Sequence, residues 1–314
     1  MTRMITRFSA GLVQAYDFST GAAVTSDVVP TVAFPITDAA NLKPDSCAVA
    51  PDLSRAVYAT PNRVNCIDRD GSTLWQLDFP PASSERPNAF NRCDFSLDGR
   101  VVWVYRPDGM ARNDAGADRW LAVDTGTGHI LAQADLGSVG HGGEHIAHPD
   151  GVHMLLDVGE GQDGARVYRG RLDGDRIELF EYEWGNRVLV STTSDGSHLM
   201  TVDHDNTDAA FHTYPDGAVV ARVPIQALGY EPFEAFIEYA GGYIDGSTAV
   251  VTVAGETEHE EEWFERYLVD PHTGEVHRRL DAPSAHQYDF EPLGDGSWLS
   301  TTDDGRLRRH TLNG

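Results

Sequence analysis

One short segment of the chain brings together residue types that hold metal ions. His141, Glu144 and His145 stand in the order His-x-x-Glu-His, which on a helix places both imidazoles on one face and the carboxylate beside a metal-bound water. Gly142 and Gly143 lie between them and disfavour a helix. The segment therefore predicts no helical zinc protease, and a metal ion here would need further ligands from distant parts of the chain.

Two acidic segments suggest other kinds of site. Residues 203–208, Asp-His-Asp-Asn-Thr-Asp, alternate oxygen-bearing side chains as a calcium loop does, but Asp208 replaces the required glycine and Tyr214 the final glutamate. We interpret this segment as a solvated acidic loop. The densest charge run is either a solvated surface or a contact for a basic partner. It consists of Glu256, Glu258, Glu260, Glu261, Glu262 and Glu265.

Nucleophilic chemistry has less support in the sequence. There is no Gly-x-Ser-x-Gly elbow, no Walker loop and no Gly-x-Gly-x-x-Gly between a strand and a helix. Cys47, Cys66 and Cys93 are widely spaced and match neither a disulfide framework nor a zinc knuckle. A thiol paired with His145 is conceivable, but buried packing thiols are the simpler interpretation.

A repeat of tight turns predicts how these residues are positioned. An Asp followed closely by Gly or Ser joins two short apolar runs at Asp52, Asp98, Asp150, Asp195, Asp245 and Asp295, which are separated by 46, 52, 45, 50 and 50 residues. After each hairpin another strand ends in a second tight turn. The signals for it are Ser19-Thr20-Gly21, Asp70-Gly71, Thr125-Gly126-Thr127-Gly128, Asp173-Gly174, Asp216-Gly217, Thr273-Gly274 and Asn313-Gly314.

These turns predict an all-β fold in which residues 1–314 form a single β-propeller domain. Seven second-turn signals and six first-turn signals indicate seven four-stranded blades, with six blades as the alternative. Strands from the N- and C-termini are expected to close the ring of blades, because such pairing protects the sheet edges. No segment has sustained helical periodicity.

The chain resembles the WD40-like and YVTN-like propeller superfamily. The resemblance rests on the hairpin turns and on second turns such as residues 269–276, Val-Asp-Pro-His-Thr-Gly-Glu-Val. The Trp-Asp dipeptide that names WD40 repeats is absent. The resemblance therefore implies a fold and no specific activity.

The connections predict which side of the blades carries function. In a four-stranded antiparallel blade, the first and third turns share one side, and these are uniformly tight here. The other side receives the long connections, residues 29–45, 80–91, 106–119, 157–165, 203–209, 224–234 and 254–262. Because long loops on a rigid scaffold are where binding and catalysis concentrate, we expect a partner on this side.

Counting back from each turn aspartate predicts which side chains meet near the axis of the propeller. Equivalent positions in the blades should form rings, which would gather His141, Glu144, His145, His286 and Asp289 at the mouth of the channel, with Asn91 and Arg92 nearby. The three histidines are candidate ligands of a first-row divalent metal, and Glu144 or Asp289 a candidate ligand or catalytic base. Polar residues around a water-filled channel are the competing interpretation.

Composition excludes some partners. The chain has 24 Lys and Arg against 49 Asp and Glu, a formal charge of −25, so it should repel nucleic acids and anionic lipid membranes. No apolar run is long enough to span a bilayer, and the first residues alternate polar and apolar side chains as a strand does. We expect a monomeric, cytoplasmic protein.

Two functions follow as hypotheses. The leading one is a binding or scaffold propeller that engages a protein or a small molecule on its long-loop side. The alternative is a metal-dependent propeller enzyme, a lyase, hydrolase or oxygenase, that works at the channel mouth.

Overall fold

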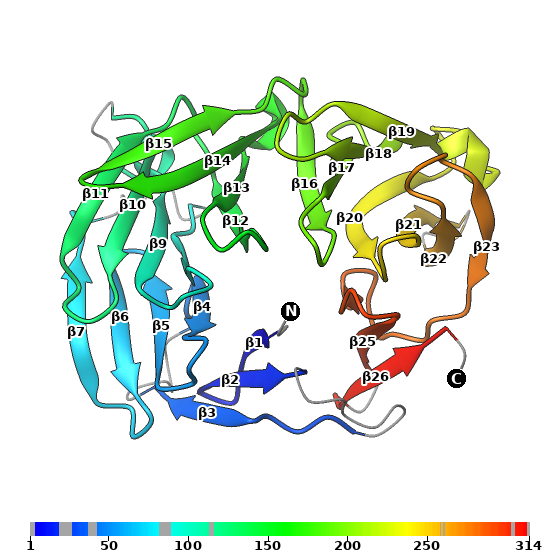
Figure 1. The fold of residues 1–314 in the computed structure, drawn as a ribbon. Coiled ribbons are helices and arrows are strands. Elements are labelled where there is room, and N and C mark those ends of the chain that lie inside the picture. Colours follow the sequence, from blue (N-terminus) through cyan, green and yellow to red (C-terminus); the bar gives the residue numbers. More distant parts are fainter. Residues whose placement is uncertain are drawn as a thin grey trace. The chain divides into compact units, whose positions relative to one another are not determined.

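The protein is built almost entirely from β-strands. The computed structural model describes residues 4–18, 27–36, 43–81, 89–112, 116–257, 259, 261–302 and 305–312. Their strands form seven antiparallel sheets, the blades of a seven-bladed β-propeller (Figure 1). The prediction of seven blades is confirmed, and the alternative of six is wrong.

Contacts along the chain divide it into two compact units. The N-terminal unit comprises Thr2–Thr20 and Pro30–Tyr182, and the C-terminal unit comprises Gly21–Val29 and Glu183–Gly314. The organisation of residues 1–314 as a single domain stays a prediction, and the two units are described separately below.

The N-terminal unit contains blades 1 to 4. Blade 1 has β1 (Met4–Ser9), β2 (Leu12–Asp17) and β3 (Val32–Pro35); blade 2 has β4 (Ser46–Val49), β5 (Arg55–Thr60), β6 (Arg63–Asp68) and β7 (Thr73–Asp78). Blade 3 has β8 (Arg92–Phe95), β9 (Val101–Arg106), β10 (Arg119–Asp124) and β11 (Ile130–Asp135); blade 4 has β12 (Gly142–Ala147), β13 (Met154–Gly159), β14 (Ala165–Asp173) and β15 (Arg176–Glu181).

The C-terminal unit contains blades 5 to 7. Blade 5 has β16 (Arg187–Thr192), β17 (His198–Asp203), β18 (Asp208–Thr213) and β19 (Val219–Pro224); blade 6 has β20 (Phe236–Tyr243), β21 (Ala249–Glu256), β22 (Glu262–Val269) and β23 (Val276–Leu280). Blade 7 has β24 (Glu291–Pro292), β25 (Ser297–Thr301) and β26 (Leu307–Thr311). Asp27 forms an antiparallel bridge with Arg308 of β26, so a segment near the N-terminus pairs with the last strand, as predicted.

The turn aspartates have the structural role that their spacing predicts. Each carboxylate accepts a hydrogen bond from the backbone N–H two residues further on, at 2.8 to 3.1 Å. This contact closes the tight turn between the first two strands of blades 2 to 7. Of the second-turn signals, Ser19-Thr20-Gly21 and Asn313-Gly314 lie outside the described residues.

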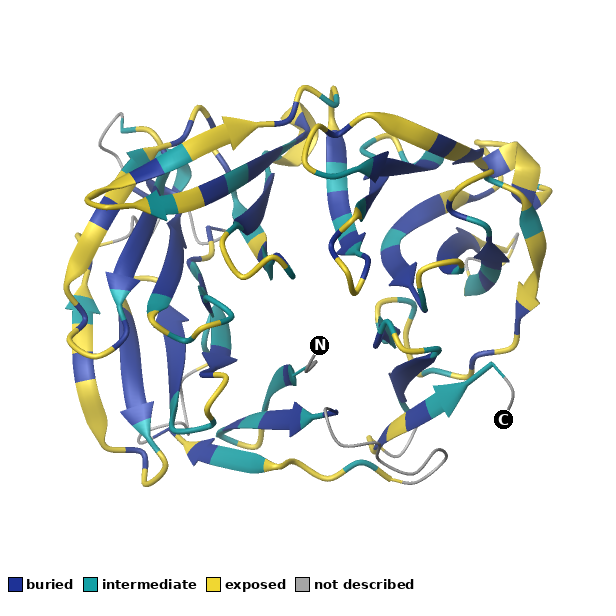
Figure 2. Ribbon diagram, in the orientation of Figure 1, coloured by how far each residue is buried: buried dark blue, intermediate teal, exposed yellow. Residues whose placement is uncertain are grey.

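Burial follows the order of the strands within a blade. The second strands of blades 2 to 7 and the third strands β6, β10 and β18 are mostly buried, whereas the fourth strands β7, β11, β15, β19 and β23 alternate or are largely exposed (Figure 2). Each unit has its own apolar clusters, such as that around Trp120 and Leu156 in the N-terminal unit and that around Phe211 and Val251 in the C-terminal unit. The blades are therefore held by apolar packing of their inner strands.

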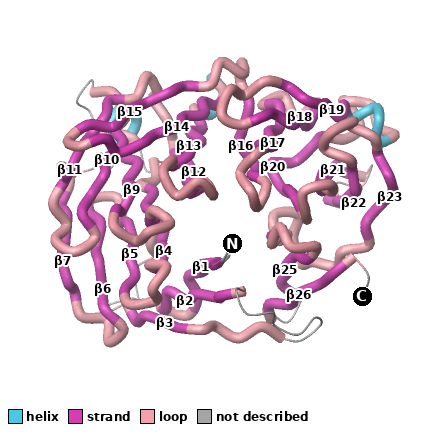
Figure 3. Tube along the Cα trace, in the orientation of Figure 1, coloured by secondary structure: helices cyan, strands magenta, loops and turns pink. Residues whose placement is uncertain are grey.

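The two ends of the blades differ in the length of their connections. One end carries tight turns, and the other carries most of the longer connections, although β5 and β6 are joined there by only two residues. We call this second end the long-loop side. Helical structure among the described residues is confined to short pieces of these connections, α1 (Asp108–Ala111), η2 (Gly161–Asp163) and η3 (Ile225–Leu228) (Figure 3). Among the described residues, none of these helices has the length and apolar composition needed to cross a bilayer.

Candidate functional site

Two of the predicted site residues meet on the first strands of neighbouring blades. Arg92 lies on β8 and Glu144 on β12, and the Arg92 Nη1 and Glu144 Oε2 atoms are 3.9 Å apart. Arg92 Nη1 also donates a hydrogen bond to the backbone oxygen of Asp45, at 3.0 Å. Arg92 and Glu144, which counting back from the turns also groups, thus lie beside each other within the N-terminal unit.

Asp94 belongs to the same cluster and was missed from the sequence. Burial raises the pKa of its carboxyl to about 7, an effect that the hydrogen bond from the Phe95 N–H opposes and the charge of Glu144 reinforces. Burial likewise raises the pKa of Asp45 to about 6, against the hydrogen bond that Asn91 donates. The available signal was the alternation of β8, in which Arg92 and Asp94 take the face opposite to the apolar Cys93 and Phe95.

His145 faces away from this cluster. Neighbouring residues of a strand point to opposite faces of the sheet, so His145 turns from Glu144 into the core of the N-terminal unit. There it is buried, and the Nε1–H of Trp120 donates to its Nε2 at 3.0 Å. Burial lowers the pKa of His145 to about 3, which keeps the ring neutral. The Nε2 atom of His145 is therefore already engaged in a hydrogen bond within the protein.

His141 and Asn91 fix the ends of strands. The His141 backbone N–H donates to the oxygen of Gly159, and its carbonyl accepts from Phe90, at 2.8 and 2.7 Å. Asn91 is almost fully buried, and its Nδ2 donates to the oxygen of Thr60 at 2.7 Å. These contacts give both residues a structural role on the long-loop side of blades 2 to 4.

His286 and Asp289 belong to the C-terminal unit, in the connection before β24. The Asp289 carboxylate accepts hydrogen bonds from the N–H and the hydroxyl of Thr301, at 2.5 and 2.8 Å. The His286 ring stacks on Tyr288 with ring centres 5.5 Å apart, and its Nδ1 accepts the Tyr288 N–H at 3.3 Å. Both residues hold this connection in place.

The predicted metal centre gains no geometric support. Across the described part of the chain, no three His, Cys, Asp or Glu side chains are arranged so that they could hold a metal ion. A site formed by His141, His145 and His286 therefore stays a prediction. The three cysteines are free thiols, and burial raises the pKa of each, for Cys47 and Cys66 to about 12, which disfavours the thiolate that a nucleophile needs.

The acidic segment 203–208 is tied to its own blade. The guanidinium of the buried Arg187 lies 3.4 Å from Asp203 Oδ2 and 2.5 Å from Asp208 Oδ1. The side chain of Asn206 donates to the oxygen of Ile237 on the next blade, at 2.7 Å. The carboxylates of Asp203 and Asp208 thus neutralise the charge of the buried Arg187, and both residues are also partly exposed to solvent.

A second buried carboxylate, Asp118 in the N-terminal unit, organises two long loops. Its oxygens accept hydrogen bonds from the Tyr105 and Ser138 hydroxyls and from the N–H groups of Gly109 and Gly140, at 2.6 to 3.0 Å. Burial nevertheless raises the pKa of Asp118, because these donors only partly replace water. We call this set of contacts the Asp118 network.

The aromatic side chain with the highest exposed fraction among the described residues lies on the long-loop side of blade 6. The connection that follows β19 passes through η3 and a turn at residues 231–235, where Phe233 is 85% exposed. Phe236 begins β20 beside it and is also exposed. Tyr230 stacks on Trp263 at the start of β22, with ring centres 5.4 Å apart. We call these four aromatic residues, together with the exposed Glu231, Glu234, Glu256, Glu261 and Glu262, the blade 6 surface.

Backbone pairing places Phe236 and Trp263 at the same end of blade 6, on opposite faces of the sheet. Phe236 pairs with Ala254, and Gly255 pairs with Trp263 across β21 and β22. A Cβ atom on Gly255 would lie 2.6 Å from the Trp263 ring and 3.0 Å from the oxygen of Glu234. Gly255 therefore allows the indole to lie flat against the sheet, next to the turn that carries Phe233.

The acidic residues of the blade 6 surface lack basic neighbours along the chain. No Lys or Arg occurs between Arg222 and Arg266. The exposed carboxylates are those of Glu231, Glu234, Glu256, Glu261 and Glu262, while Glu258 and Glu260 lie outside the described residues. Glu256 and Glu262 are directly opposite each other on β21 and β22, a like-charged pair that destabilises a sheet.

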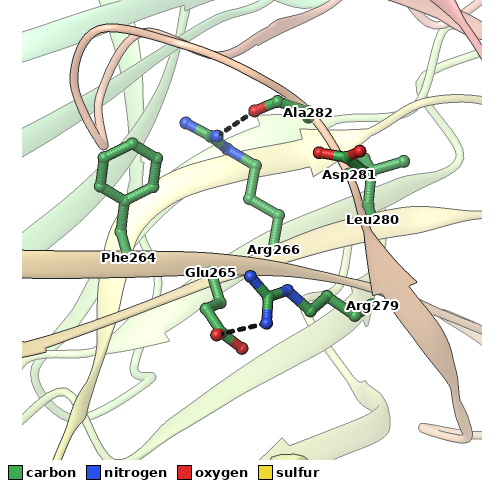
Figure 4. A pocket seen from close by; sticks show the side chains of 7 residues that line it. All are labelled: Phe264, Glu265, Arg266, Arg279, Leu280, Asp281 and Ala282. Carbon is green, nitrogen blue, oxygen red and sulfur yellow. Dashed lines mark hydrogen bonds and ion pairs between the residues drawn. The ribbon is translucent and has the colours of Figure 1, made fainter.

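A recess of about 480 Å³ adjoins the blade 6 surface at the edge formed by β22 and β23 (Figure 4). Glu265 lies between the two. Its carboxylate accepts hydrogen bonds from the Tyr230 and Tyr267 hydroxyls, at 2.9 and 2.8 Å, and lies 2.5 Å from the Arg279 guanidinium. On the other face of β22, Figure 4 shows Arg266 next to Phe264.

Arg266 is a buried residue that lines this recess. It is 2% exposed, its guanidinium lies 4.9 Å from the ring centres of Phe264 and Phe290, and it donates to the oxygens of Ala282 and Gln287 at 3.0 and 3.1 Å. Burial lowers its pKa to about 10, so it stays charged at neutral pH. Arg266 thus anchors the connection that precedes β24.

The aromatic residues of the blade 6 surface were not predicted from the sequence, which indicated only that the glutamate run is either a solvated surface or a contact for a basic partner. The signal that could have found them is the composition of residues 229–236, Gly-Tyr-Glu-Pro-Phe-Glu-Ala-Phe, which places three aromatic residues in a connection where polar residues are usual.

Comparison with known proteins supports the fold alone. No protein-family model matches the chain, and no curated protein matches it. Among solved structures, BamB from Moraxella catarrhalis, a β-propeller, is 14% identical with a TM-score of 0.53 and covers 99% of this chain and 82% of its own.

Two further structures are similar to the chain. Hydrazine synthase from Kuenenia stuttgartiensis is 14% identical with a TM-score of 0.55, over 82% of this chain and 72% of its own. The structure of U3-55K is 7% identical with a TM-score of 0.55, over 96% of this chain and 89% of its own. At such identities the similarity establishes the propeller architecture and transfers no activity.

Proposed function

We propose that this protein is a binding propeller and that a partner protein docks on the blade 6 surface. The observation that carries the proposal is Phe233, which is 85% exposed in a long connection that also holds Tyr230 and leads into the exposed Phe236. Large exposed aromatic groups are unfavourable in water, and they dominate the energetics of protein interfaces once buried.

The position of the surface supports the same proposal. Phe236 and Trp263 lie on strands and need little reordering when a partner docks, so less of the interaction energy is lost to conformational entropy. The stacking of Tyr230 on Trp263, and the hydrogen bonds of Tyr230 to Glu265 and Tyr267, pre-organise part of the surface.

Affinity capture tests this proposal. Wild-type protein and the variant Phe233→Ser would be immobilised and exposed to an extract of the source organism, and a retained protein would then be purified and its binding measured directly. We expect Phe233→Ser to weaken binding of the purified partner by about thirtyfold, the loss of one interface hot spot.

The matched control is Phe180→Ser. Phe180 is 42% exposed on β15 of the N-terminal unit, so its loss changes exposed apolar area without touching blade 6. Binding that survives Phe180→Ser and is lost with Phe233→Ser supports the proposal. A partner that binds both variants as tightly as wild type contradicts it.

A metal-dependent enzyme is the alternative hypothesis, and elemental analysis of protein purified without a chelator or an affinity tag addresses it. Stoichiometric metal that is lost in His145→Ala would favour this alternative and the predicted ligand set. We also propose a cytoplasmic location, supported by the three free thiols, and a monomeric state without nucleic-acid or membrane partners, supported by the charge of −25.

A further inference from the structure

We infer that the segment that docks on the blade 6 surface is basic, with Lys or Arg side chains flanking an apolar residue. This inference rests on the proposed function and specifies the chemistry of the partner. Three features of the surface lead to it: its uncompensated negative charge, its aromatic faces and the exposed Phe233 between them.

The negative charge is concentrated where the aromatic residues lie. Glu231 and Glu234 flank Phe233 in the sequence and are exposed with it. No ion pair of Glu231, Glu234, Glu256, Glu261 or Glu262 with a Lys or Arg side chain occurs among the described residues, in contrast to Glu265, which contacts Arg279. Lys or Arg side chains of a partner could therefore pair with these carboxylates, which no Lys or Arg of the described residues already pairs with.

The opposed pair Glu256 and Glu262 strengthens this argument. Like charges directly across two antiparallel strands repel each other, so the free protein bears an electrostatic cost at this position. A cation placed between the two carboxylates would convert that repulsion into attraction. An acidic or neutral segment would leave the repulsion in place.

The aromatic residues supply the apolar part of the surface. The Tyr230 and Trp263 rings are stacked on each other and only partly buried, so they add apolar contact area. Phe233 and Phe236 offer apolar area for the residue between the cations. A segment that alternates basic and apolar residues matches both kinds of contact.

A labelled synthetic peptide tests the inference without knowledge of the natural partner. The probe is a short fluorescent peptide in which lysines flank two leucines, and the comparison peptide has glutamates in place of the lysines. Fluorescence anisotropy should show binding of the lysine peptide, weakened by added salt, and much weaker binding of the glutamate peptide.

Site specificity is measured with matched charge variants. Glu231→Gln with Glu234→Gln removes two charges from the blade 6 surface, and Asp70→Asn with Asp175→Asn removes two exposed charges from turns of the N-terminal unit. The first pair should weaken binding of the lysine peptide by about tenfold, and the second should leave it nearly unchanged. Equal losses in both double variants would show non-specific attraction to an acidic protein and overturn the inference.

Failure of the inference is separable from failure of the proposed function. If the captured partner depends on Phe233 but not on Glu231 and Glu234, the surface binds a partner that is not basic, and only the inference is wrong. If neither the lysine peptide nor the partner responds to any change on blade 6, both are wrong.

Discussion

The Asp118 network and the blade 6 surface both lie on long-loop sides, yet they use carboxylates in opposite ways. Asp118 is fully buried and accepts four hydrogen bonds from its own unit. Glu231 and Glu234 are exposed, on a turn whose apolar residue Phe233 is exposed with them. The first arrangement is complete without a partner, whereas the second leaves charge and apolar area for another molecule.

This difference separates carboxyl groups with a shifted pKa from carboxyl groups that can bind a partner. The buried Asp118 and the partly buried Asp94 have raised pKa values, a common property of active sites, but here their hydrogen bonds and neighbours hold loops and strands together. The blade 6 glutamates are distinguished instead by their exposure near exposed aromatic side chains. Exposed charge near exposed apolar area, and not a shifted pKa, identifies the candidate binding site.

The largest expected effect belongs to Asp118→Ala. Loss of this carboxylate leaves the Tyr105 and Ser138 hydroxyls and two backbone N–H groups buried without an acceptor, which should lower the free energy of unfolding by about 3 kcal/mol. Chemical denaturation measures it. A loss below about 1 kcal/mol would mean that water readily replaces the carboxylate and that the network is not structural.

The next effect concerns His145 and depends on pH. Its folded pKa of about 3 lies below the unfolded value of 6.5, so below pH 6.5 the unfolded chain takes up a proton that the folded protein refuses. Stability should therefore fall as the pH drops, by about 2 kcal/mol between pH 6.5 and 5.

The variant His145→Gln keeps an acceptor for the Trp120 N–H but has no ionisable ring. Its stability relative to wild type should rise by that amount over the same pH range, as measured by denaturant titration. If the stability of both proteins depended equally on pH, the imidazole of His145 would be accessible to protons in the folded protein. That result would support His145 as a metal ligand or a base.

A smaller effect is expected at the turns. Hydrogen bonds from the Ser197 N–H, and from the Ser197 and Thr193 hydroxyls, lower the pKa of Asp195 to about 2 from 3.8. The stabilisation from this carboxylate is complete above pH 3.8 and is lost as the pH falls through 2. Because Asp195 is largely exposed, the loss should be about 1 kcal/mol, and it should be absent in Asp195→Asn.

The smallest effect on stability belongs to Phe233→Ser. An 85% exposed side chain contributes little to folding, so the free energy of unfolding should change by less than about 0.5 kcal/mol while binding is lost. Thermal unfolding checks this value. A loss as large as that of Asp118→Ala would make Phe233 part of the core of its unit and remove the contrast between the two regions.

The sequence predicted the architecture well because its signals are local. Each turn aspartate makes its hydrogen bond two residues away, so the spacing of Asp52 to Asp295 reports the blades directly. Arg92 and Glu144 occupy equivalent positions on neighbouring first strands, which explains why their side chains lie 3.9 Å apart.

Side-chain direction was the part that the sequence did not give. The pattern grouped Glu144 with His145, but neighbouring residues of β12 face opposite sides, and His145 turns to Trp120. Nor did counting along the chain reveal the blade 6 surface, because Tyr230 and Trp263 lie far apart in the sequence and stack only in the folded blade.

Hydrogen–deuterium exchange with and without the lysine peptide tests the central claim most directly. Bound peptide should slow exchange at residues 230–236 and 254–263, and the protection should disappear in Phe233→Ser combined with Glu231→Gln and Glu234→Gln. Protection confined to these two segments would establish the blade 6 surface as the docking site. Protection elsewhere, or unchanged protection in the variant, would contradict the account.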